Sequence, residues 1–302
     1  MNSQVDVIIT TYKRKPEVLK RAVKSVLEQS FQNFKIYIID DSPAEYAGRE
    51  ETASLINALN DNRITYSQND TNIGACASRN RGAEMGEGEY IAFLDDDDVW
   101  LPNKIEEQIK RFTSKSIAMV YCDYFQYFTD KDKMRQHYLK STPPSGMIFK
   151  AFLSNNVAGS CSFPMLRRSA FVEVGGFDPT MPALQDWELW LRISKKYEVA
   201  YVSQPLAKYY FYEGERISAH PERRVVAFER ILHEFNMDYA VNKNEKAAYY
   251  LMGVKFYSFD KNLKKAIQFW IDAIRLNPLN IKNNLIAGVK MVGRQFYNSK
   301  TP

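Results

Sequence analysis

The chain has 302 residues, a formal net charge of +5 and 45% hydrophobic residues. This apolar content supports one large core or two unequal ones, which excludes disorder as the main state. The longest apolar runs fall far short of the about 18 residues that cross a bilayer, and the first residues lack the pattern of a signal peptide. From these features we expect a cytoplasmic protein without a spanning helix.

The charge is distributed unevenly along the chain. Residues 221–302 hold 14 Lys and Arg against 7 Asp and Glu, a net charge of +7, whereas residues 1–220 hold 27 against 29, a net charge of −2. Such asymmetry indicates two regions with different partners. We therefore divide the chain into domains at residue 220.

The first part of the chain alternates between strand and helix patterns. Val5–Thr10 and Lys35–Ile39 are apolar runs, and Pro16–Gln29 places its apolar residues at helical spacing. The same alternation continues with a helix over Glu50–Leu59, a strand over Ile64–Ser67, a helix over Ala75–Met85 and a strand over Tyr90–Leu94. This order predicts an α/β fold with a parallel sheet, in which ligands bind at the carboxyl ends of the strands.

The second half of the chain contains an irregular stretch and then helices. Residues 130–162 predict a long loop that is functional or mobile, and helices are expected near Arg168–Val174 and over Asp186–Lys196. Residues 225–297 are helical in pattern throughout. Residues 245–278 resemble one tetratricopeptide unit, which we expect to pack on the first domain or on a second copy, with peptide binding as the alternative.

Two groups of carboxylates directly follow predicted strands. Asp40 and Asp41 stand where a parallel sheet presents its ligand crevice, and they would accept hydrogen bonds from a base or a ribose or act as turn residues. The run from Asp95 to Asp98 places four like charges together, so the fold needs a cation or many donors there. Oxygen ligands favour Mg²⁺ or Mn²⁺ shared with a substrate diphosphate, and a helix cap is the alternative.

A further carboxylate opens an amphipathic helix. Asp186 is flanked by Trp187 and Trp190, which could desolvate it and raise its pKa toward that of a general base. An ordinary helix cap is the competing interpretation of Asp186.

Taken together, these segments resemble inverting glycosyltransferases of family two, which have the GT-A fold. The matching segments are Val5–Arg14, Ile38–Ser42, Asn72–Gly74 with Ala77–Asn80, Gly88–Asp98, Gly175–Asp178 and Asp186–Arg192. They span residues 1 to roughly 220 in the order of the family. The resemblance implies a mixed, mostly parallel sheet in a catalytic domain over 1–220, followed by an all-helical extension over 221–302.

The resemblance also implies roles for individual residues. The nucleotide would be held by Thr10, Tyr12, Asp41, Arg79 and Asp96. Asp95 and Asp97 would bind the divalent cation, Mn²⁺ or Mg²⁺, and Asp186 would deprotonate the acceptor hydroxyl. Gln185 stands where the family usually has a glutamate, so Asp186 is expected to be less basic than in relatives.

The expected enzyme is a metal-dependent inverting glycosyltransferase. It would move a sugar from a nucleotide diphosphate donor, a UDP-sugar, to a hydroxyl of a surface glycan or a lipid-linked oligosaccharide. One alternative is a nucleotidyltransferase, although Thr10–Arg14 lacks the expected glycine. The other is a non-catalytic scaffold that binds partners, including a second copy of the chain, through its helical tail.

The last predicted helix, Ile281–Phe296, is amphipathic and basic. Its apolar stripe is flanked by Lys282, Lys290 and Arg294, and residues 281–302 hold four basic residues and no acidic ones. Such a helix lies on an anionic membrane, which would place the protein on the inner face of the cell membrane, or it packs against the preceding helices. Nucleic acid is not an expected partner, because the basic residues are few and lack interleaved aromatic residues.

Overall fold

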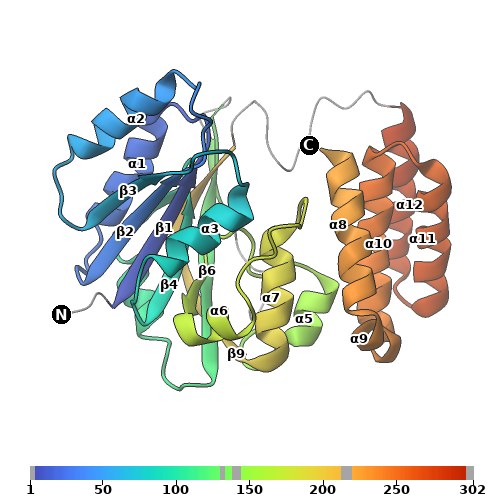
Figure 1. Cartoon of the computed structure of the whole chain (residues 1–302). Coiled ribbons are helices and arrows are strands. Elements are labelled where there is room, and N and C mark those ends of the chain that lie inside the picture. Colours follow the sequence, from blue (N-terminus) through green and yellow to red (C-terminus); the bar gives the residue numbers. More distant parts are fainter. Residues whose placement is uncertain (1–3, 130–132, 138–143, 212–219, 297–302) are drawn as a thin grey trace. The chain divides into compact units, whose positions relative to one another are not determined.

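The computed structural model describes residues 4–129, 133–137, 144–211 and 220–296 (Figure 1). The chain folds into two compact units, which are described separately below. The first unit comprises 1–148, 158–180 and 192–213, and the second comprises 149–157, 181–191 and 214–302. Two short segments from the range 1–220 thus group with the C-terminal helices, and the domain division at residue 220 stays a prediction.

The first unit is built on four parallel strands that the sequence predicted. They are β1 (Val5–Thr11), β2 (Phe34–Asp40), β3 (Ile64–Gln68) and β4 (Tyr90–Asp95), connected by α1 (Pro16–Leu27), α2 (Gly48–Asn57) and α3 (Ala75–Glu84). Thr11 pairs in register with Asp40, and Thr10 pairs with Asp95. The carboxyl ends of three strands therefore meet at one edge of the sheet, as the alternation predicted.

The sheet then continues with strands of both directions. These are β5 (Val99–Trp100), β6 (Ile117–Phe128), β8 (Met165–Arg167) and β9 (Glu198–Phe211), accompanied by α4 (Lys104–Ile109) and α6 (Arg168–Glu173). The strand order is β3-β2-β1-β4-β8-β6-β9-β5, with β7 (Lys133–His137) paired to β6. β4 and β6 both run antiparallel to β8, whereas β6 and β9 are parallel. The sheet is mixed, as the family resemblance implied.

The irregular stretch predicted over residues 130–162 is only partly irregular. It contains β7 and the helix α5 (Phe149–Ser154), while residues 130–132 and 138–143 lie outside the described residues. β7 has no β-branched residue, and all five of its residues pair with β6. α5 is short, and Phe152 and Leu153 are buried in it. Tertiary pairing and packing thus outweigh the weak local signals of both elements.

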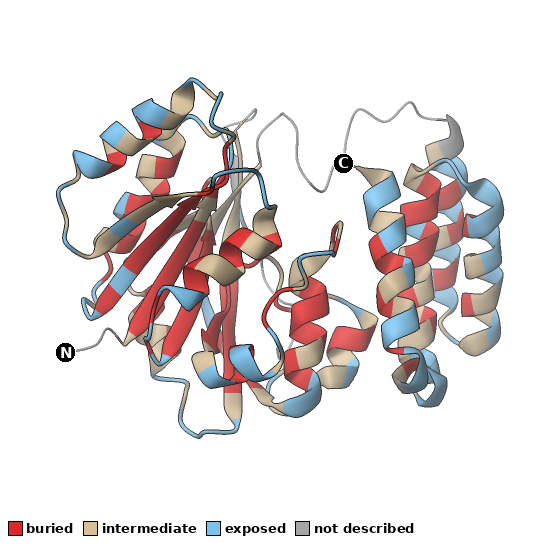
Figure 2. Ribbon diagram, viewed as in Figure 1, coloured by how far each residue is buried: buried red, intermediate tan, exposed pale blue. Residues whose placement is uncertain are grey.

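The core of the first unit explains why these elements form. Figure 2 shows the central strands as buried, in agreement with strands covered on both faces. α1 begins with Pro16 in its first turn and buries Leu19, Val23 and Val26 at helical spacing. Fully burying an apolar side chain of this size contributes about 1.5–3 kcal/mol, so the α1 stripe is a substantial part of this core.

The second unit contains helices, as predicted over the described residues 225–296. They are α5, α7 (Gln185–Lys196, which ends in the first unit), α8 (Pro221–Glu234), α9 (Asn236–Val241), α10 (Lys243–Phe259), α11 (Leu263–Leu276) and α12 (Ile281–Phe296). Phe228 stacks on Tyr249 at 4.6 Å between centroids, and Tyr257 stacks on Phe269 at 5.4 Å. Gly253 allows the Phe228 ring to approach, since a Cβ there would lie 2.6 Å from it. Aromatic packing therefore joins α8, α10 and α11.

Candidate active site

The loop after β1 presents an exposed aromatic ring at the carboxyl edge of the sheet. The backbone turns at Lys13, which has φ of +48°, and the Lys13 N–H donates to Ser42 Oγ at 2.8 Å. This bond ties the loop after β1 to the loop after β2. Tyr12 is 47% exposed, so its ring is accessible for stacking, while Thr10 is half-buried and is the last residue but one of β1. The nucleotide contacts of both residues stay predictions.

Asp41 shapes the loop that leads into α3. Asn69 Nδ2 and the Ile73 N–H donate to Asp41 Oδ1 at 2.7 and 2.9 Å, and the Gly74 N–H donates to Oδ2 at 2.8 Å. Gly74 has φ of +87°, a conformation that a side chain would strain. The nucleotide contact predicted for Asp41 stays a prediction. The sequence did not predict that Asp41 also holds the loop before α3 through these hydrogen bonds.

Arg79 on α3 reaches the first carboxylate of the acidic run. Its Nη2 donates to Asp95 Oδ1 at 2.8 Å, and Ser160 Oγ donates to Asp95 Oδ2 at 2.9 Å. The Arg79 residue is 8% exposed, so this ion pair is largely shielded from water. Arg79 thus lies beside the acidic run, and the nucleotide contact that the family resemblance implied for it stays a prediction.

Arg14 bridges the next two carboxylates. Its Nε donates to Asp96 Oδ1 at 2.8 Å, its Nη2 lies 3.2 Å from Asp97 Oδ2, and Thr11 Oγ1 donates to Asp96 Oδ2 at 2.7 Å. Arg21 Nη2 on α1 donates to the Asp97 carbonyl oxygen at 2.8 Å. Burial raises the pKa of Asp96 to about 7, and the positive charge of Arg14 opposes that rise. Asp96 is therefore held by two donors inside the protein.

Asp98 differs from the other three members of the run. It is fully buried, Ser162 Oγ donates to it at 2.6 Å, and the Tyr210 N–H donates to it at 3.2 Å. Burial, with the nearby charges of Asp95 and Asp97, raises the pKa of Asp98 well above its ordinary value. Its bonds connect the acidic run to β9, so its position is structural.

The donor set of this edge is compatible with a divalent cation bound together with phosphates. Among the described residues, no group of three or more His, Cys, Asp or Glu side chains is arranged as a metal site. Asp95 and Asp97 have side chains 28% and 24% exposed, more than Asp96 at 7%. Because Mg²⁺ commonly takes one or two carboxylates and completes its shell with substrate phosphates and water, Asp95 and Asp97 fit such an ion. Arg79 and Arg14 supply positive charge to these carboxylates in the present structure.

Asp186 lies in the second unit, in the first turn of α7. The helix begins at Gln185, one residue before the predicted start, so Asp186 is inside the first turn. Its Oδ1 accepts from the Trp187 N–H at 2.7 Å, and Asn156 Nδ2 donates to its Oδ2 at 3.3 Å. Trp187 is buried and donates from Nε1 to the Phe152 carbonyl oxygen. The carboxylate is thus oriented from both oxygens, and its role as a base stays a prediction.

Several site residues escaped the sequence reasoning. Arg14, Thr11 and Ser160 contact the acidic run, and Asn156 contacts Asp186, although none of them was assigned a role. The sequence held a signal for Arg14. This basic residue follows β1, and β1 pairs with β4, the strand that leads into the four aspartates. Ser160 and Asn156 had no such signal, since they lie in the stretch predicted to be irregular.

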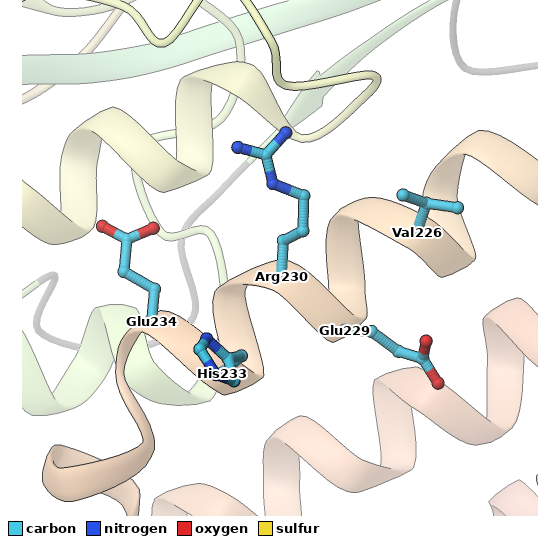
Figure 3. Close-up of a pocket in the computed structure, with 5 residues that line it drawn as sticks. All are labelled: Val226, Glu229, Arg230, His233 and Glu234. Atoms are coloured by element: carbon cyan, nitrogen blue, oxygen red, sulfur yellow. The ribbon is translucent and has the colours of Figure 1, made fainter.

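Two cavities in the described part of the chain lie away from these predicted residues. One of about 410 Å³ runs along α8 and is lined by Val226, Glu229, Arg230, His233 and Glu234 (Figure 3). Figure 3 shows Arg230 and Glu234 extending to the same side of the helix. Another of about 270 Å³ lies at the turn between α2 and β3, where Tyr66 forms part of its wall. We therefore define the candidate site by its side-chain chemistry.

Comparisons with known proteins give the family. The sequence model of the family described as Glycosyl transferase family 2 matches residues 6–175. WcaA of Escherichia coli strain K12, named as a colanic acid biosynthesis glycosyl transferase, is 33% identical over 201 residues, which cover 65% of this chain and 68% of WcaA. WfaP of Escherichia coli, a UDP-Glc:α-D-GlcNAc-diphosphoundecaprenol β-1,3-glucosyltransferase, is 29% identical over 76% of this chain and 85% of its own length.

A solved structure gives the fold. The structure of S. aureus TarS residues 1–349 in complex with UDP-GlcNAc superposes with a TM-score of 0.68 at 17% identity, covering 96% of this chain and 89% of that TarS chain. At this identity the likeness concerns the fold, which is the expected GT-A fold with added helices. The matched residues 6–175 contain β1 to β4 and the whole acidic run at their carboxyl edge. The chain therefore belongs to glycosyl transferase family 2.

Proposed function

We propose that this glycosyltransferase moves a sugar from a UDP-sugar to a hydroxyl of a lipid-linked or surface glycan, with inversion at the anomeric carbon. The donor is supported by the UDP-GlcNAc bound in TarS and by the UDP-Glc in the name of WfaP. The acceptor is supported by WfaP, whose name specifies a diphosphoundecaprenol-linked sugar. The nucleotidyltransferase alternative has no support from the family.

One observation carries the proposal for the donor site. Exposed Tyr12 stands on the same sheet edge as Asp95–Asp97, and Arg14 and Arg79 pair with these carboxylates. In this proposal Tyr12 stacks on the base with Thr10 and Asp41 beside it, and Asp96 lies near the ribose. Asp95 and Asp97 hold Mn²⁺ or Mg²⁺ with the diphosphate, and a cation bound there supplies stabilisation of negative charge on the leaving group.

Arg14 and Arg79 have a defined electrostatic task in this site. Without a cation, adjacent carboxylates repel one another, and the two guanidinium groups at 2.8–3.2 Å reduce that repulsion. Asp97 is bound by Arg14 through the longest of these contacts, so it is the carboxylate most easily released to another cation. The arginines thereby keep the acidic run folded before a donor arrives.

The second half of the proposal concerns the acceptor. The Asp186 carboxylate takes the proton of the acceptor hydroxyl, while the acceptor oxygen bonds to the anomeric carbon on the face opposite the nucleotide. The bond from that carbon to the diphosphate oxygen breaks, and its electron pair leaves with the nucleotide. One base and no protein nucleophile are sufficient for this displacement. The bonds from Asn156 and Trp187 hold the carboxylate in a fixed orientation, which favours proton transfer.

Calorimetric titration of UDP and of UDP-sugars, with and without Mn²⁺, tests the donor site. We expect Mn²⁺ to tighten nucleotide binding about tenfold or more, and Asp97→Asn to remove that metal dependence. The matched control is Asp70→Asn, which changes an exposed aspartate outside the site. Nucleotide affinity that is indifferent both to Mn²⁺ and to Asp97→Asn would refute the metal role. An absence of nucleotide binding under all conditions would favour the scaffold alternative.

A further inference from the structure

The outer surface of α11 and α12 exposes an unusual amount of apolar side chain. Of the 17 large hydrophobic residues that are exposed among the described residues, nine lie between positions 263 and 292. They are Leu263, Ile267, Ile271, Leu279, Ile281, Leu285, Ile286, Val289 and Val292. Figure 2 shows exposed residues on both helices. We call this surface the α11–α12 edge.

The packing of α12 leaves one stripe uncovered. Gly288 faces Trp270 of α11, where a Cβ would lie 2.8 Å from the ring, and Trp270 Nε1 donates to the Asn284 carbonyl oxygen at 2.8 Å. Ile281, Leu285, Val289 and Val292 recur at helical spacing on another side of the helix and are 53–72% exposed. The side chain of Phe296, which the sequence added to this stripe, lies outside the described residues. The contacts of α12 thus use one side and leave an apolar stripe facing out.

The positive charge of residues 221–302 is concentrated in the part of the sequence that contains this edge. Residues 261–302 hold 8 Lys and Arg against one Asp, a net charge of +7, whereas residues 221–260 hold 6 of each sign, a net charge of 0. The whole excess noted for residues 221–302 therefore belongs to the last two helices and the residues around them. Lys282 and Lys290 are exposed on α12 and form no ion pair with an acidic side chain in the described part of the chain.

A cluster of positively charged side chains on α8, α10 and α12 adds to this positive charge. Lys255 on α10 is exposed, yet the desolvation of its ammonium group by nearby protein atoms lowers its pKa, and the positive charges of Arg224, Arg294 and Lys290 lower it further. Three basic side chains from α8 and α12 are therefore close enough to Lys255 to repel its ammonium group. Arg294 is steadied by the ring of Phe259, 4.4 Å from its guanidinium carbon. A negatively charged partner would relieve this repulsion.

We propose that the α11–α12 edge lies on an anionic lipid surface. Leu285, Val289 and Val292 enter the boundary between head groups and acyl chains, and Lys282 and Lys290 contact lipid phosphates. An amphipathic helix with basic flanks binds membranes in this manner, through buried apolar area together with attraction to anionic lipids. No helix in the described residues is both long and apolar enough to span a bilayer, so this binding is interfacial.

The positive charge of the α11–α12 edge favours an anionic lipid surface over a second copy of the chain as its partner. A symmetric dimer would bring the same surface of each copy together, so two edges with the same positive excess would face one another. Uncompensated like charges directly opposed across an interface oppose association, whereas an anionic bilayer is complementary to them. The edge therefore fits a lipid surface better than it fits itself. The inference rests on this surface and not on the donor chemistry.

Co-sedimentation of the full chain with vesicles tests the proposal. The vesicles are pure phosphatidylcholine or an about equal mixture of phosphatidylcholine and phosphatidylglycerol. The apolar variant is Leu285→Ser, Val289→Ser and Val292→Ser, and the charge variant is Lys282→Gln and Lys290→Gln. The matched apolar control is Met237→Ser with Val241→Ser on α9, where the two side chains are 77% and 80% exposed. Thermal melting of each variant confirms that it is folded, and UDP titration shows whether the donor site is intact.

We expect the wild-type chain to bind the anionic vesicles, with weaker binding at high salt. The charge variant should lose roughly 30-fold in affinity and the apolar variant at least about tenfold, while the α9 control binds as the wild type does. No binding by the wild type, equal binding to neutral vesicles, or an equal loss in the α9 control would overturn the proposal. A dimer in sedimentation velocity that the apolar variant dissociates, with vesicle binding unchanged, would show that a second copy covers the edge. UDP affinity unchanged in all variants separates this outcome from a failure of the proposed donor site.

Discussion

The two units use charged side chains in opposite ways. In the first unit, carboxylates and guanidinium groups are paired inside the protein, as in Asp6 with Arg168 at 2.6 Å and Asp96 with Arg14 at 2.8 Å. On the α11–α12 edge of the second unit, the positive charges exceed the negative ones and stay on the surface. Paired charges hold a fold and a site together, whereas an unpaired surface excess is available to an external partner. The net charge of +5 conceals this difference.

The largest expected effect concerns the one carboxylate to which we assign a proton transfer. Asp186→Asn keeps the size of the side chain but removes its ability to accept the acceptor proton. We expect sugar transfer to fall by about 10²–10⁴-fold, while UDP affinity stays within about twofold of the wild-type value. Release of UDP in a coupled assay measures transfer, and Asp70→Asn serves as the control. Comparable turnover by Asp186→Asn and the wild type would remove Asp186 from the mechanism.

The next largest effect is expected on stability, when the buried ion pair of Asp6 in the first unit is broken. Asp6 is fully buried, and both Arg168 Nη2 and the Gly88 N–H donate to its Oδ2 at 2.6 Å. Asp6→Ala leaves a mostly buried guanidinium without its counter-charge, and we expect a loss of about 3–5 kcal/mol in the free energy of unfolding. Urea denaturation measures this loss.

The control for this substitution comes from the other unit. Asp272 pairs with Arg275 one turn along the surface of α11, at 3.2 Å. Asp272→Ala should change the free energy of unfolding by less than about 1 kcal/mol. Equal losses from Asp6→Ala and Asp272→Ala would mean that burial does not distinguish the charges of the two units.

A buried lysine gives a third test, through pH. Lys104 is fully buried, its Nζ donates to Gln108 Oε1 at 2.6 Å and lies 4.1 Å from the Trp100 ring centroid. Burial lowers the pKa of Lys104 from its ordinary value of 10.5 to about 8. As pH falls between these two values, the unfolded chain binds the proton first, so Lys104 makes the free energy of unfolding fall by about 3 kcal/mol, with no further change below pH 8.

Lys104→Met removes this pH dependence and keeps most of the side-chain volume. We expect the difference in free energy of unfolding between the variant and the wild type to shift in favour of the variant as pH falls from about 10.5 to about 8. Loss of the bond to Gln108 lowers the stability of the variant by a constant amount at all pH values. Melting temperatures across this range measure the shift, and parallel curves for the two proteins would mean that Lys104 is not desolvated.

The sequence was most informative where local pattern and burial agree. β1 to β4 and their helices have apolar runs bounded by polar turns, and their ends were predicted to within two residues. β6 and β9 were missed, although β6 contains the buried apolar run Ala118–Cys122 near its start. Their later residues are largely aromatic and half-buried, as in Tyr127 and Tyr210, so neither alternation nor an apolar run marks these parts of the strands. Pairing between distant segments supplies the order that the local sequence lacks.

The same division applies to the candidate site. The acidic run after β4 was visible because four adjacent aspartates are unusual, but the sequence treated them as one group. The structure separates Asp98, which is buried and bonded to Ser162, from Asp95–Asp97 at the edge. The pairing of Arg14 with Asp96 depends on the turn at Lys13 and on the register of β1 with β4, which no local pattern specifies.

The smallest expected effect is a gain in stability, in contrast to the losses expected in the first unit. Lys290→Gln removes one member of the cluster whose other members are Lys255, Arg224 and Arg294, so repulsion decreases and the melting temperature rises slightly. Because Lys290 is exposed, we expect a gain of less than about 0.5 kcal/mol in the free energy of unfolding, which disappears at high salt. Lys282→Gln, on the same helix but not among the charges acting on Lys255, is the control and should leave stability unchanged.

This prediction expresses the contrast between the two units. A paired charge of the first unit stabilises the fold, so its removal lowers stability. An excess charge of the α11–α12 edge opposes the fold, and an anionic partner would compensate it. A salt-independent loss of stability in Lys290→Gln would show that this lysine is paired within the protein, and the two units would then no longer differ in this respect.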